Sequence, residues 1–294
     1  MVVEIIAGTP PGGGQDRTAR ALAEVLGSGV TVTNLPGRGG GNAWDRLVRR
    51  RGATDLAAVS SPTLITNAIV GESDIDHRDL SPLGLLYTEH SALVVRPGFG
   101  LEQPSAMLDA MGNGSAVVSF ATALGSMNHL ILAEIATHLG VPVSTLPMRV
   151  FDSAPLALAD LVKGSGHIAV VSAVSAVPAL GDGMLAPVMV TSPQRLGGAF
   201  AATPTCVELG VHCVRGTWRG LVGPPGLDRW VVDAWGERLG GAVGTEAWRR
   251  LLEDNLWTGT FLGPDETGLF LEAEREQLSE LLEEVGLVTT VGDG

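Results

Sequence analysis

The amino-acid sequence predicts an α/β protein in which helices cover mostly parallel sheets. Short apolar runs alternate with longer helical patterns through most of the chain, an alternation typical of α/β layers. Glycine is frequent, at 40 of 294 residues, and aromatic residues make up only 4%, a composition that suits parallel strands under closely packed helices. Two extended apolar stretches bounded by Gly or Pro interrupt the alternation, so we expect two lobes.

The hydrophobic pattern places each element. Strands are expected at Val2–Ile6, Val30–Asn34, Leu56–Ser60, Ser91–Val95, Ala116–Phe120, Val143–Leu146, His167–Val171, Leu185–Val190 and Thr217–Val222. Helices are expected at Gln15–Leu26, Asn42–Arg50, Ser105–Met111, Met127–Leu139, Ala154–Val162, Asp228–Leu239, Thr245–Leu252 and Asp265–Val285. Helices alone occupy the last part of the chain.

The two extended stretches, 91–97 and 216–224, are the expected crossings between lobes. One lobe would then comprise residues 1–96 and 217–294, and the other residues 97–216. A two-lobed protein of this build is expected to bind its ligand in the cleft between its lobes.

The bulk charge excludes one class of partner. The formal net charge is −13 and the pI is about 4.8, whereas nucleic-acid binding needs a basic face. No apolar run approaches the roughly 18 residues that a membrane helix needs. No export signal precedes the first expected strand, so we expect either a cytosolic protein or a processed, mature form.

The two cysteines, Cys206 and Cys213, show no metal-binding spacing, and zinc is not expected. In an exported protein they could form a disulfide that closes a small loop. The sequence alone leaves this open and slightly favours two unpaired, buried thiols.

The first strand ends in a glycine-rich turn that leads directly into a helix. Because glycine has no Cβ, a ligand can approach such a backbone closely. The first amides of a helix lack intrahelical acceptors and favour anions. The residues expected to contact a ligand here are Thr9, Pro11, Gly12, Gly13 and Gly14. Asp16 would repel an anionic ligand, and we expect it to stabilise the loop.

A second turn of this kind follows the strand that ends near Phe120. Its candidate ligand contacts are Ala121, Thr122, Gly125 and Ser126. Ser126 is a suitable N-cap for the next helix. His129 is expected to have a capping or surface role rather than a catalytic one. Two anion-ready turns, one in each lobe, suit a di- or tricarboxylate.

Further candidates lie at other strand ends. Ser60 and Ser61 follow a buried strand, and Ser153 begins a helix beside Asp152, which we expect to act as a cap. Arg219 lies in an apolar stretch, and its partner could be a structural carboxylate or the carboxylate of the ligand. Trp218 beside it is expected to pack.

No sequence motif indicates catalysis or a cofactor. The chain contains no Gly-x-Ser-x-Gly, His-Glu-x-x-His or P-loop pattern, and the Gly12–Gly14 turn lacks the spacing of a dinucleotide site. We therefore expect no enzyme, no cofactor and no metal. A small-molecule enzyme on an α/β scaffold remains the less favoured alternative.

Five segments, in this order, resemble the Bug-type substrate-binding proteins of tripartite tricarboxylate transporters. They are Pro10–Asp16, Asn34–Gly40, Ala121–Glu134, Ser153–Leu158 and Pro204–Gly210. The resemblance implies a type II periplasmic-binding-protein fold, or Venus flytrap, with two hinge strands. It also implies a monomeric, extracytoplasmic receptor that takes a small carboxylate to a membrane permease.

The family's ligand contacts, carried over by position, fall on Thr9, Gly12 to Gly14, Ser60, Ala121, Thr122 and Ser126. The sequence departs from the family at Ala7-Gly8-Thr9, at Val171-Ser172 where the family has Asp-Asn, and in the Thr-Trp-Arg-Gly stretch, which only part of the family shares. Ser172 is a candidate ligand contact because it occupies the position of the Asn in that pair. Citrate, a C4 dicarboxylate, adipate or terephthalate would all fit, and a sensory receptor of the same fold that serves a histidine kinase is the alternative function.

Overall fold

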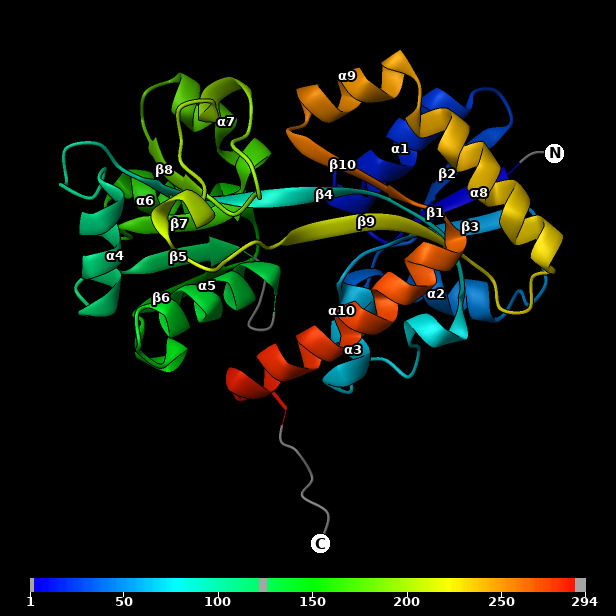
Figure 1. Ribbon diagram of the computed structural model, residues 1–294, viewed down its shortest axis with the longest axis horizontal. Coiled ribbons are helices and arrows are strands. Elements are labelled where there is room, and N and C mark those ends of the chain that lie inside the picture. Colours follow the sequence, from blue (N-terminus) through cyan, green and yellow to red (C-terminus); the bar gives the residue numbers. More distant parts are fainter. Residues whose placement is uncertain (1–2, 122–125, 289–294) are drawn as a thin grey trace, which may run out of the picture. The chain divides into compact units, whose positions relative to one another are not determined.

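The computed structural model describes residues 3–121 and 126–288, and the chain divides into two compact units (Figure 1). Unit 1 comprises Met1–Thr88 and Thr217–Glu280, and unit 2 comprises Glu89–Gly216 and Leu281–Gly294. The chain passes from one unit to the other within strand β4 (Ser81–Val95), at the start of β9 (Gly216–Gly223) and within helix α10 (Pro264–Glu284). The first boundary therefore falls between positions 88 and 89, and the second falls between 216 and 217.

Unit 1 is built on a sheet in the order β2–β1–β3–β9. Strands β1 (Val3–Ala7), β2 (Val30–Asn34) and β3 (Leu56–Ser60) are parallel, with Ile5 opposite Val32 on one side and Ala57 on the other. Strand β9 runs antiparallel to β3. The carboxyl ends of the three parallel strands therefore lie at one edge of this sheet.

Helices cover both faces of that sheet. They are α1 (Gly14–Leu26), α2 (Gly41–Val48), α3 (Thr63–Ile69), α8 (Arg229–Val243), α9 (Glu246–Asp254) and most of α10. Ile5 packs in one core cluster with Leu22 of α1, whereas the adjacent Ile6 packs in another with Trp44 of α2. Neighbouring strand residues thus face opposite sides, as the pleat requires.

An aromatic group lies in the first of these clusters. Tyr87 stacks on Trp257 at a centroid distance of 4.0 Å and makes a tilted contact with Trp248 at 6.1 Å. The Tyr87 hydroxyl hydrogen-bonds to the Thr18 hydroxyl at 2.7 Å, which satisfies a polar group in an apolar surrounding. Trp257 begins strand β10 (Trp257–Leu262), which pairs with β4.

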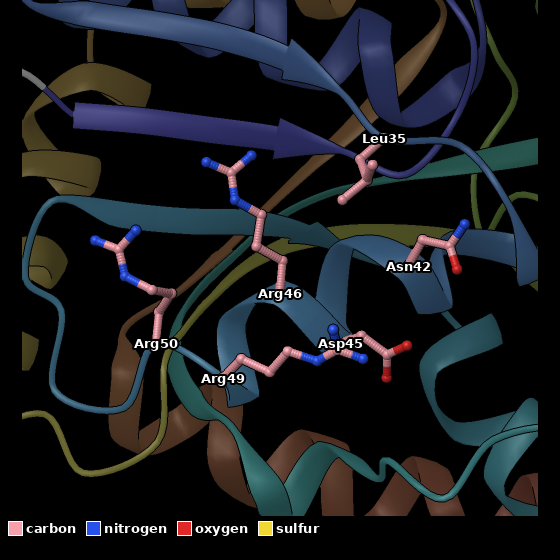
Figure 2. Close-up of a pocket in the computed structure, with 6 residues that line it drawn as sticks. All are labelled: Leu35, Asn42, Asp45, Arg46, Arg49 and Arg50. Atoms are coloured by element: carbon pink, nitrogen blue, oxygen red, sulfur yellow. The ribbon is translucent and has the colours of Figure 1, made fainter.

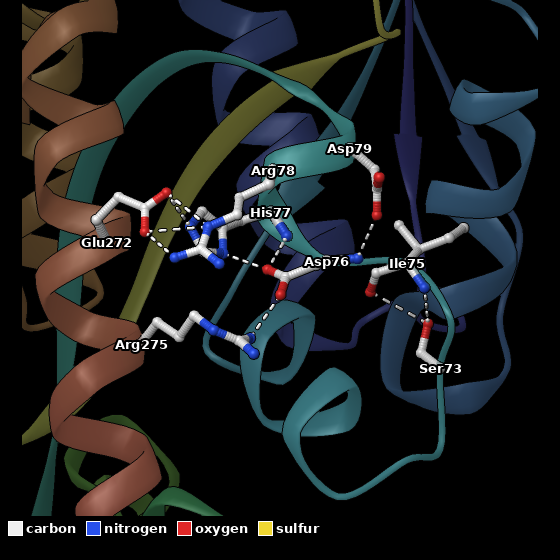
Figure 3. A network of polar contacts seen from close by, with 8 residues as sticks. All are labelled: Ser73, Ile75, Asp76, His77, Arg78, Asp79, Glu272 and Arg275. Atoms are coloured by element: carbon white, nitrogen blue, oxygen red, sulfur yellow. Dashed lines mark hydrogen bonds and ion pairs between the residues drawn. The ribbon is translucent and has the colours of Figure 1, made fainter.

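A polar network holds α10 to the 3-10 helix His77–Asp79 (Figure 3). Glu272 accepts hydrogen bonds from Arg78, and its Oε1 lies 3.2 Å from His77 Nε2. Arg275 pairs with Asp76 at 2.5 Å. Hydrogen bonding from Arg78 outweighs desolvation and lowers the pKa of Glu272 to about 2.

Unit 2 repeats the parallel arrangement with a second set of strands. β5 (Val118–Ala121) lies between β6 (Met148–Phe151) and β7 (Ile168–Ser172), parallel to both. β7 pairs antiparallel with the second half of β4, which also pairs antiparallel with β8 (Ala186–Val190). The helices are α4 (Pro104–Gly112), α5 (Met127–His138), α6 (Ala154–Lys163) and α7 (Ala173–Gly181).

Short 3-10 helices occupy several connections. Beside His77–Asp79 they are Arg38–Gly40, Val143–Thr145, Gly198–Phe200 and Val207–Leu209. The strand expected at Val143–Leu146 is therefore wrong. Proline on both sides, Pro142 and Pro147, favours a turn there, and the strand begins only at Met148.

Candidate functional site

The loops that leave the parallel strands of unit 1 are joined by one side chain, Gln15. Its Oε1 accepts the Gly8 N–H at 2.8 Å, and its Nε2 donates to the Gly39 carbonyl at 3.2 Å. The same Nε2 lies 3.5 Å from Ser61 Oγ. Gln15 is 2% exposed and ties together the loops after β1, β2 and β3. In open α/β sheets, ligands bind outside the carboxyl ends of the strands, which is where these loops lie.

Asp16 has the structural role that we expected. Its carboxylate accepts hydrogen bonds from Gly12 N–H and Asn34 Nδ2, each at 2.8 Å, and from Arg20 Nε at 3.0 Å. Burial opposes its ionisation, but these hydrogen bonds outweigh burial and lower the pKa of Asp16. The carboxylate is thus ionised and fully engaged by the loop. Gly12 has φ +82°, a left-handed conformation that favours glycine.

The start of α1 presents two backbone donors. Gly13 is its N-cap residue and supplies no side-chain cap. The Thr9 hydroxyl accepts the Asp16 N–H at 3.1 Å, whereas no described residue accepts the N–H of Gly14 or of Gln15. Helix N-terminal amides and the helix dipole together favour an anion.

A guanidinium lies against these amides. A Cβ placed on Gly14 would collide with Nη2 of Arg219, so the absence of a side chain at position 14 lets Arg219 approach the loop. Arg219 belongs to β9, where its neighbour Gly220 is paired with Ser60 of β3. The structure therefore brings Gly14, Ser60 and Arg219 together at one edge. Trp218 packs edge-to-face on Phe270 and donates to Glu274 at 3.0 Å, which agrees with its expected packing role.

Ser61 and Pro11, two of the remaining candidates in unit 1, differ in how accessible they are to a ligand. Ser61 is 1% exposed, and its hydroxyl is hydrogen-bonded to Thr63 Oγ1 at 2.8 Å. Pro11 is exposed. Ser61 therefore belongs to the support of the loops, and Pro11 lies at their surface.

In unit 2, three serines precede the helices that follow the parallel strands. Ser126, Ser153 and Ser172 are the N-cap residues of α5, α6 and α7, and none makes a side-chain cap hydrogen bond. The cap of α6 is thus Ser153 and not Asp152. Because β5, β6 and β7 are parallel, these helix starts share one edge of the unit 2 sheet. Three uncapped helix starts make that edge a second candidate for an anion.

The Ser126 hydroxyl is the notable group at this edge. Its Oγ is buried and has no hydrogen-bond partner among the described residues. A buried hydroxyl without a partner is costly, so a ligand atom that accepts its hydrogen would be favoured. Ser172 Oγ, in contrast, is hydrogen-bonded to Ser175 Oγ at 2.7 Å. The expected contacts Thr122 and Gly125 lie outside the described residues.

Sequence reasoning did not identify Ser91 and Asn128 at this edge. Asn128 Nδ2 donates to the Ala121 carbonyl at 3.3 Å, and Ser91 Oγ donates to Asn128 Oδ1 at 3.0 Å. Ser91 lies opposite Ser172 in the ladder between β4 and β7. The position of Asn128 in the first turn of a helix after a strand was the available signal.

The expected surface role of His129 is wrong. The side chain is 4% exposed and stacks on Phe120 with a centroid distance of 5.8 Å. Desolvation lowers the pKa of His129. The His129 side chain is therefore an uncharged imidazole in the core.

A positively charged pocket of about 430 Å³ lies beside α2 in unit 1 (Figure 2). It is lined by Leu35, Asn42, Asp45, Arg46, Arg49 and Arg50. Arg46 pairs with Glu4 at 2.6 Å. Figure 2 shows the side chains of Arg46 and Arg49 pointing in different directions, so their donors do not converge on one point. This pocket is less suited to a carboxylate than the start of α1.

The described part of the chain holds neither a metal site nor a membrane-spanning helix. No group of three or more His, Cys, Asp or Glu residues there could hold a metal ion. No helix within residues 3–121 and 126–288 is long and apolar enough to cross a membrane.

The fold is that of the two-lobed periplasmic binding proteins. A TctC solute-binding protein from Polaromonas, solved without ligand, superposes with a TM-score of 0.80 at 24% identity and covers 96% of this chain and 98% of its own. R. palustris Rpa4515 with adipate gives 0.82 at 20% identity over 97% of both chains. MatC from Rhodopseudomonas palustris with bound malate gives 0.74 at 22%, over 96% of this chain and 98% of its own.

The sequence identifies the family. Residues 16–287 match the tripartite tricarboxylate transporter family receptor, TctC, and the chain belongs to that family. Protein BugT of Bordetella pertussis is 26% identical over 295 residues, which cover 97% of this chain and 89% of that protein. The receptors of this family are periplasmic solute-binding proteins, and neither the family nor the fold is that of an enzyme.

Proposed function

We propose that this receptor binds a small di- or tricarboxylate and delivers it to the membrane permease of a tripartite tricarboxylate transporter. The observation that carries the proposal is the start of α1, where two backbone amides without described acceptors lie beside the Arg219 guanidinium. A guanidinium and a pair of amides can bind both oxygens of one carboxylate. The family description, which names the transporter, supports the permease as the partner.

The proposed residues form two subsites, each for one carboxylate group. In unit 1 they are Thr9, Pro11, Gly12, Gly13, Gly14, Ser60, Ser61 and Arg219. In unit 2 they are Ala121, Thr122, Gly125, Ser126, Ser153 and Ser172. Gly14 and Arg219 carry most of the first subsite, and Ser126 carries most of the second. Ser61 acts by holding the loops in place.

Two structural neighbours support a dicarboxylate. Rpa4515 was solved with adipate and MatC with malate, and both ligands carry a carboxylate at each end. Two separate anion-ready edges match such a ligand better than they match a monocarboxylate. We therefore propose C4 to C6 dicarboxylates and citrate as the first ligands to test.

A thermal-shift screen tests the proposal. The purified protein, freed of ligand, is heated with citrate, malate, adipate or terephthalate, and with acetate as a monocarboxylate control. A ligand at 100 times its Kd stabilises the native state by about 2.7 kcal/mol, which corresponds to a rise in Tm of several degrees. A rise with one or two polycarboxylates but not with acetate supports the proposal. A flat response to every polycarboxylate contradicts it.

Delivery needs a separate experiment. The ligand-loaded receptor is mixed with detergent-solubilised permease and, in parallel, with a histidine kinase sensor domain from the same genome. Retention on the permease alone supports transport. Retention on the sensor domain alone would assign the receptor to signalling instead.

A further inference from the structure

We propose that Cys206 and Cys213 form a disulfide when the chain folds outside the cytoplasm. Both cysteines lie in unit 2, and both side chains are fully buried in its hydrophobic core. The Cys213 and Cys206 thiols interact with each other, and this interaction raises the pKa of Cys213. Two thiols held together in an oxidising compartment are the usual precursor of a structural disulfide.

The backbone between them turns back on itself. Val207–Leu209 form a 3-10 helix, and Gly210 follows in the left-handed conformation with φ 75°. The Val211 N–H then donates to the Cys206 carbonyl at 2.9 Å, and this bond closes the turn. The chain after Gly210 thus returns to the position of Cys206.

The residues after the turn alternate between core and solvent. Val211 and Cys213 are buried, whereas His212 and Val214 are exposed. The Cys213 N–H donates to the Val211 carbonyl at 2.9 Å, so the chain makes a second tight turn at His212. The buried Cys213 side chain lies in the same core cluster as Cys206 and Val211.

The reaction is thiol–disulfide exchange with a protein disulfide oxidant. One cysteine thiolate attacks a sulfur of the oxidant's disulfide, and that disulfide breaks to leave a mixed disulfide and a free thiolate on the oxidant. The second cysteine thiolate then attacks the mixed disulfide, which forms the Cys206–Cys213 bond and releases the oxidant as a dithiol. The two thiols of this chain lose two electrons and two protons, and the oxidant gains both.

Exchange has to precede complete folding. Only the thiolate reacts, and the interaction of the Cys213 thiol with Cys206, together with burial and the nearby Glu134 carboxylate, raises the pKa of Cys213. Burial also excludes an oxidant protein from either sulfur. A chain that folds in a reducing compartment therefore keeps its dithiol, and a chain that folds after export keeps its disulfide.

The bond would fix the segment that enters β9. The Arg215 carbonyl accepts from Thr191 Oγ1 at 2.6 Å, and Arg215 Nε lies 2.6 Å from Glu134 Oε1. A disulfide at Cys213 adds a covalent anchor two residues before this pair. The inference depends on the extracytoplasmic location in the proposed function, but it does not depend on the ligand.

Counting thiols tests the inference directly. The full chain is produced once with an export signal and once in a reducing cytosol. Each sample is denatured in the presence of N-ethylmaleimide, with or without prior reduction, and its intact mass is measured by mass spectrometry. We expect no adduct on the exported chain without reduction, two adducts after reduction, and two adducts on the cytosolic chain. Two adducts on the unreduced exported chain, or a covalent dimer, would overturn the inference.

Stability gives a second readout. The disulfide would close a loop with six residues between the cysteines, so we expect the exported chain to melt roughly 5–10 °C above the cytosolic chain. The double variant Cys206→Ser, Cys213→Ser is the control and should melt at one temperature from either source. Equal Tm values for the two wild-type samples would contradict the inference. Because neither readout uses a carboxylate, a failed ligand screen leaves both unaffected.

Discussion

The strand-end edges of the two units share one topology but offer different chemistry. Each edge has three parallel strands followed by helix starts. In unit 1, Gln15 and Asp16 are fully engaged in holding loops, and the proposed ligand contacts are backbone amides at the start of α1, with the Arg219 guanidinium beside Gly14. In unit 2, the serines at the N-cap positions make no side-chain cap hydrogen bond, and the Ser126 hydroxyl has no partner among the described residues.

This difference indicates how each edge responds to mutation. A site made of backbone amides is insensitive to removal of a neighbouring hydroxyl but sensitive to an added side chain. A site made of serine hydroxyls shows the opposite response. The two edges can therefore be tested independently with small substitutions.

The largest expected effect is at Arg219. Replacing Arg219 with Gln removes a charge-assisted pair of hydrogen bonds, and we expect the carboxylate Kd to rise roughly 10- to 100-fold. Arg219→Lys should recover part of this loss because it keeps the charge but not the bidentate geometry. Titration calorimetry measures the Kd values. Arg50→Gln, in the pocket of Figure 2, is the matched control and should bind normally. An unchanged Kd in Arg219→Gln would remove this arginine from the site.

An added methyl group at Gly14 tests the backbone donors. Gly14→Ala places a Cβ where the Arg219 guanidinium lies, so the guanidinium has to move, and we expect the Kd to rise about tenfold. Gly241→Ala in α8, where a Cβ meets nothing within 4 Å, is the control. Equal affinity of the two variants, measured by calorimetry, would break the proposed role of the α1 start.

The hydroxyl of Ser126 tests the other edge. Ser126→Ala removes a buried group that has no partner among the described residues. The Tm without ligand should therefore be unchanged or higher, while the Kd rises about threefold to tenfold. Ser165→Ala, on an exposed residue, controls for the loss of a hydroxyl. A lower Tm with an unchanged Kd would mean that Ser126 serves the fold and not the ligand.

The smallest expected effect is the loss, at low pH, of the contribution that Glu272 makes to stability. The pKa of Glu272 is about 2 in the folded protein and ordinary when unfolded, so its stabilising contribution is present above pH 4.5 and is lost as the pH falls toward 2. Glu272→Gln should therefore lower Tm at pH 7 by about 2 °C or less, because the pair with Arg78 is exposed. The difference from wild type should vanish near pH 2. A difference that stays constant from pH 7 to pH 2 would exclude this ionisation as its cause.

Local signals explain what the sequence could predict. The glycine turn, the start of α1 and the N-cap position of Ser126 are each encoded by a few adjacent residues, and the structure places these elements where the sequence predicts them. Strand β10 was missed because the last part of the chain was expected to contain helices alone. The first half of β4, from Ser81, was missed because Pro82 and Gly84 interrupt its pattern.

Contacts between residues that are far apart in the chain explain what the sequence could not predict. Gln15 meets Gly39 and Ser61, which are 24 and 46 residues away, and no local pattern encodes those pairs. Asn128 and Ser91, 37 residues apart, meet only because β4 lies beside β7. The burial of His129 depends on the core around Phe120 in the same way.

The aromatic group around Tyr87 has a practical consequence. All six tryptophans and the single tyrosine lie in unit 1, whereas both cysteines and the only lysine, Lys163, lie in unit 2. Tryptophan fluorescence therefore records the unfolding of the first unit alone, and in the reduced chain the reaction of a maleimide with the two buried thiols records the unfolding of the second. The unfolding of each unit can thus be followed separately through residues that the chain already contains, without introducing a tryptophan or a cysteine by mutation.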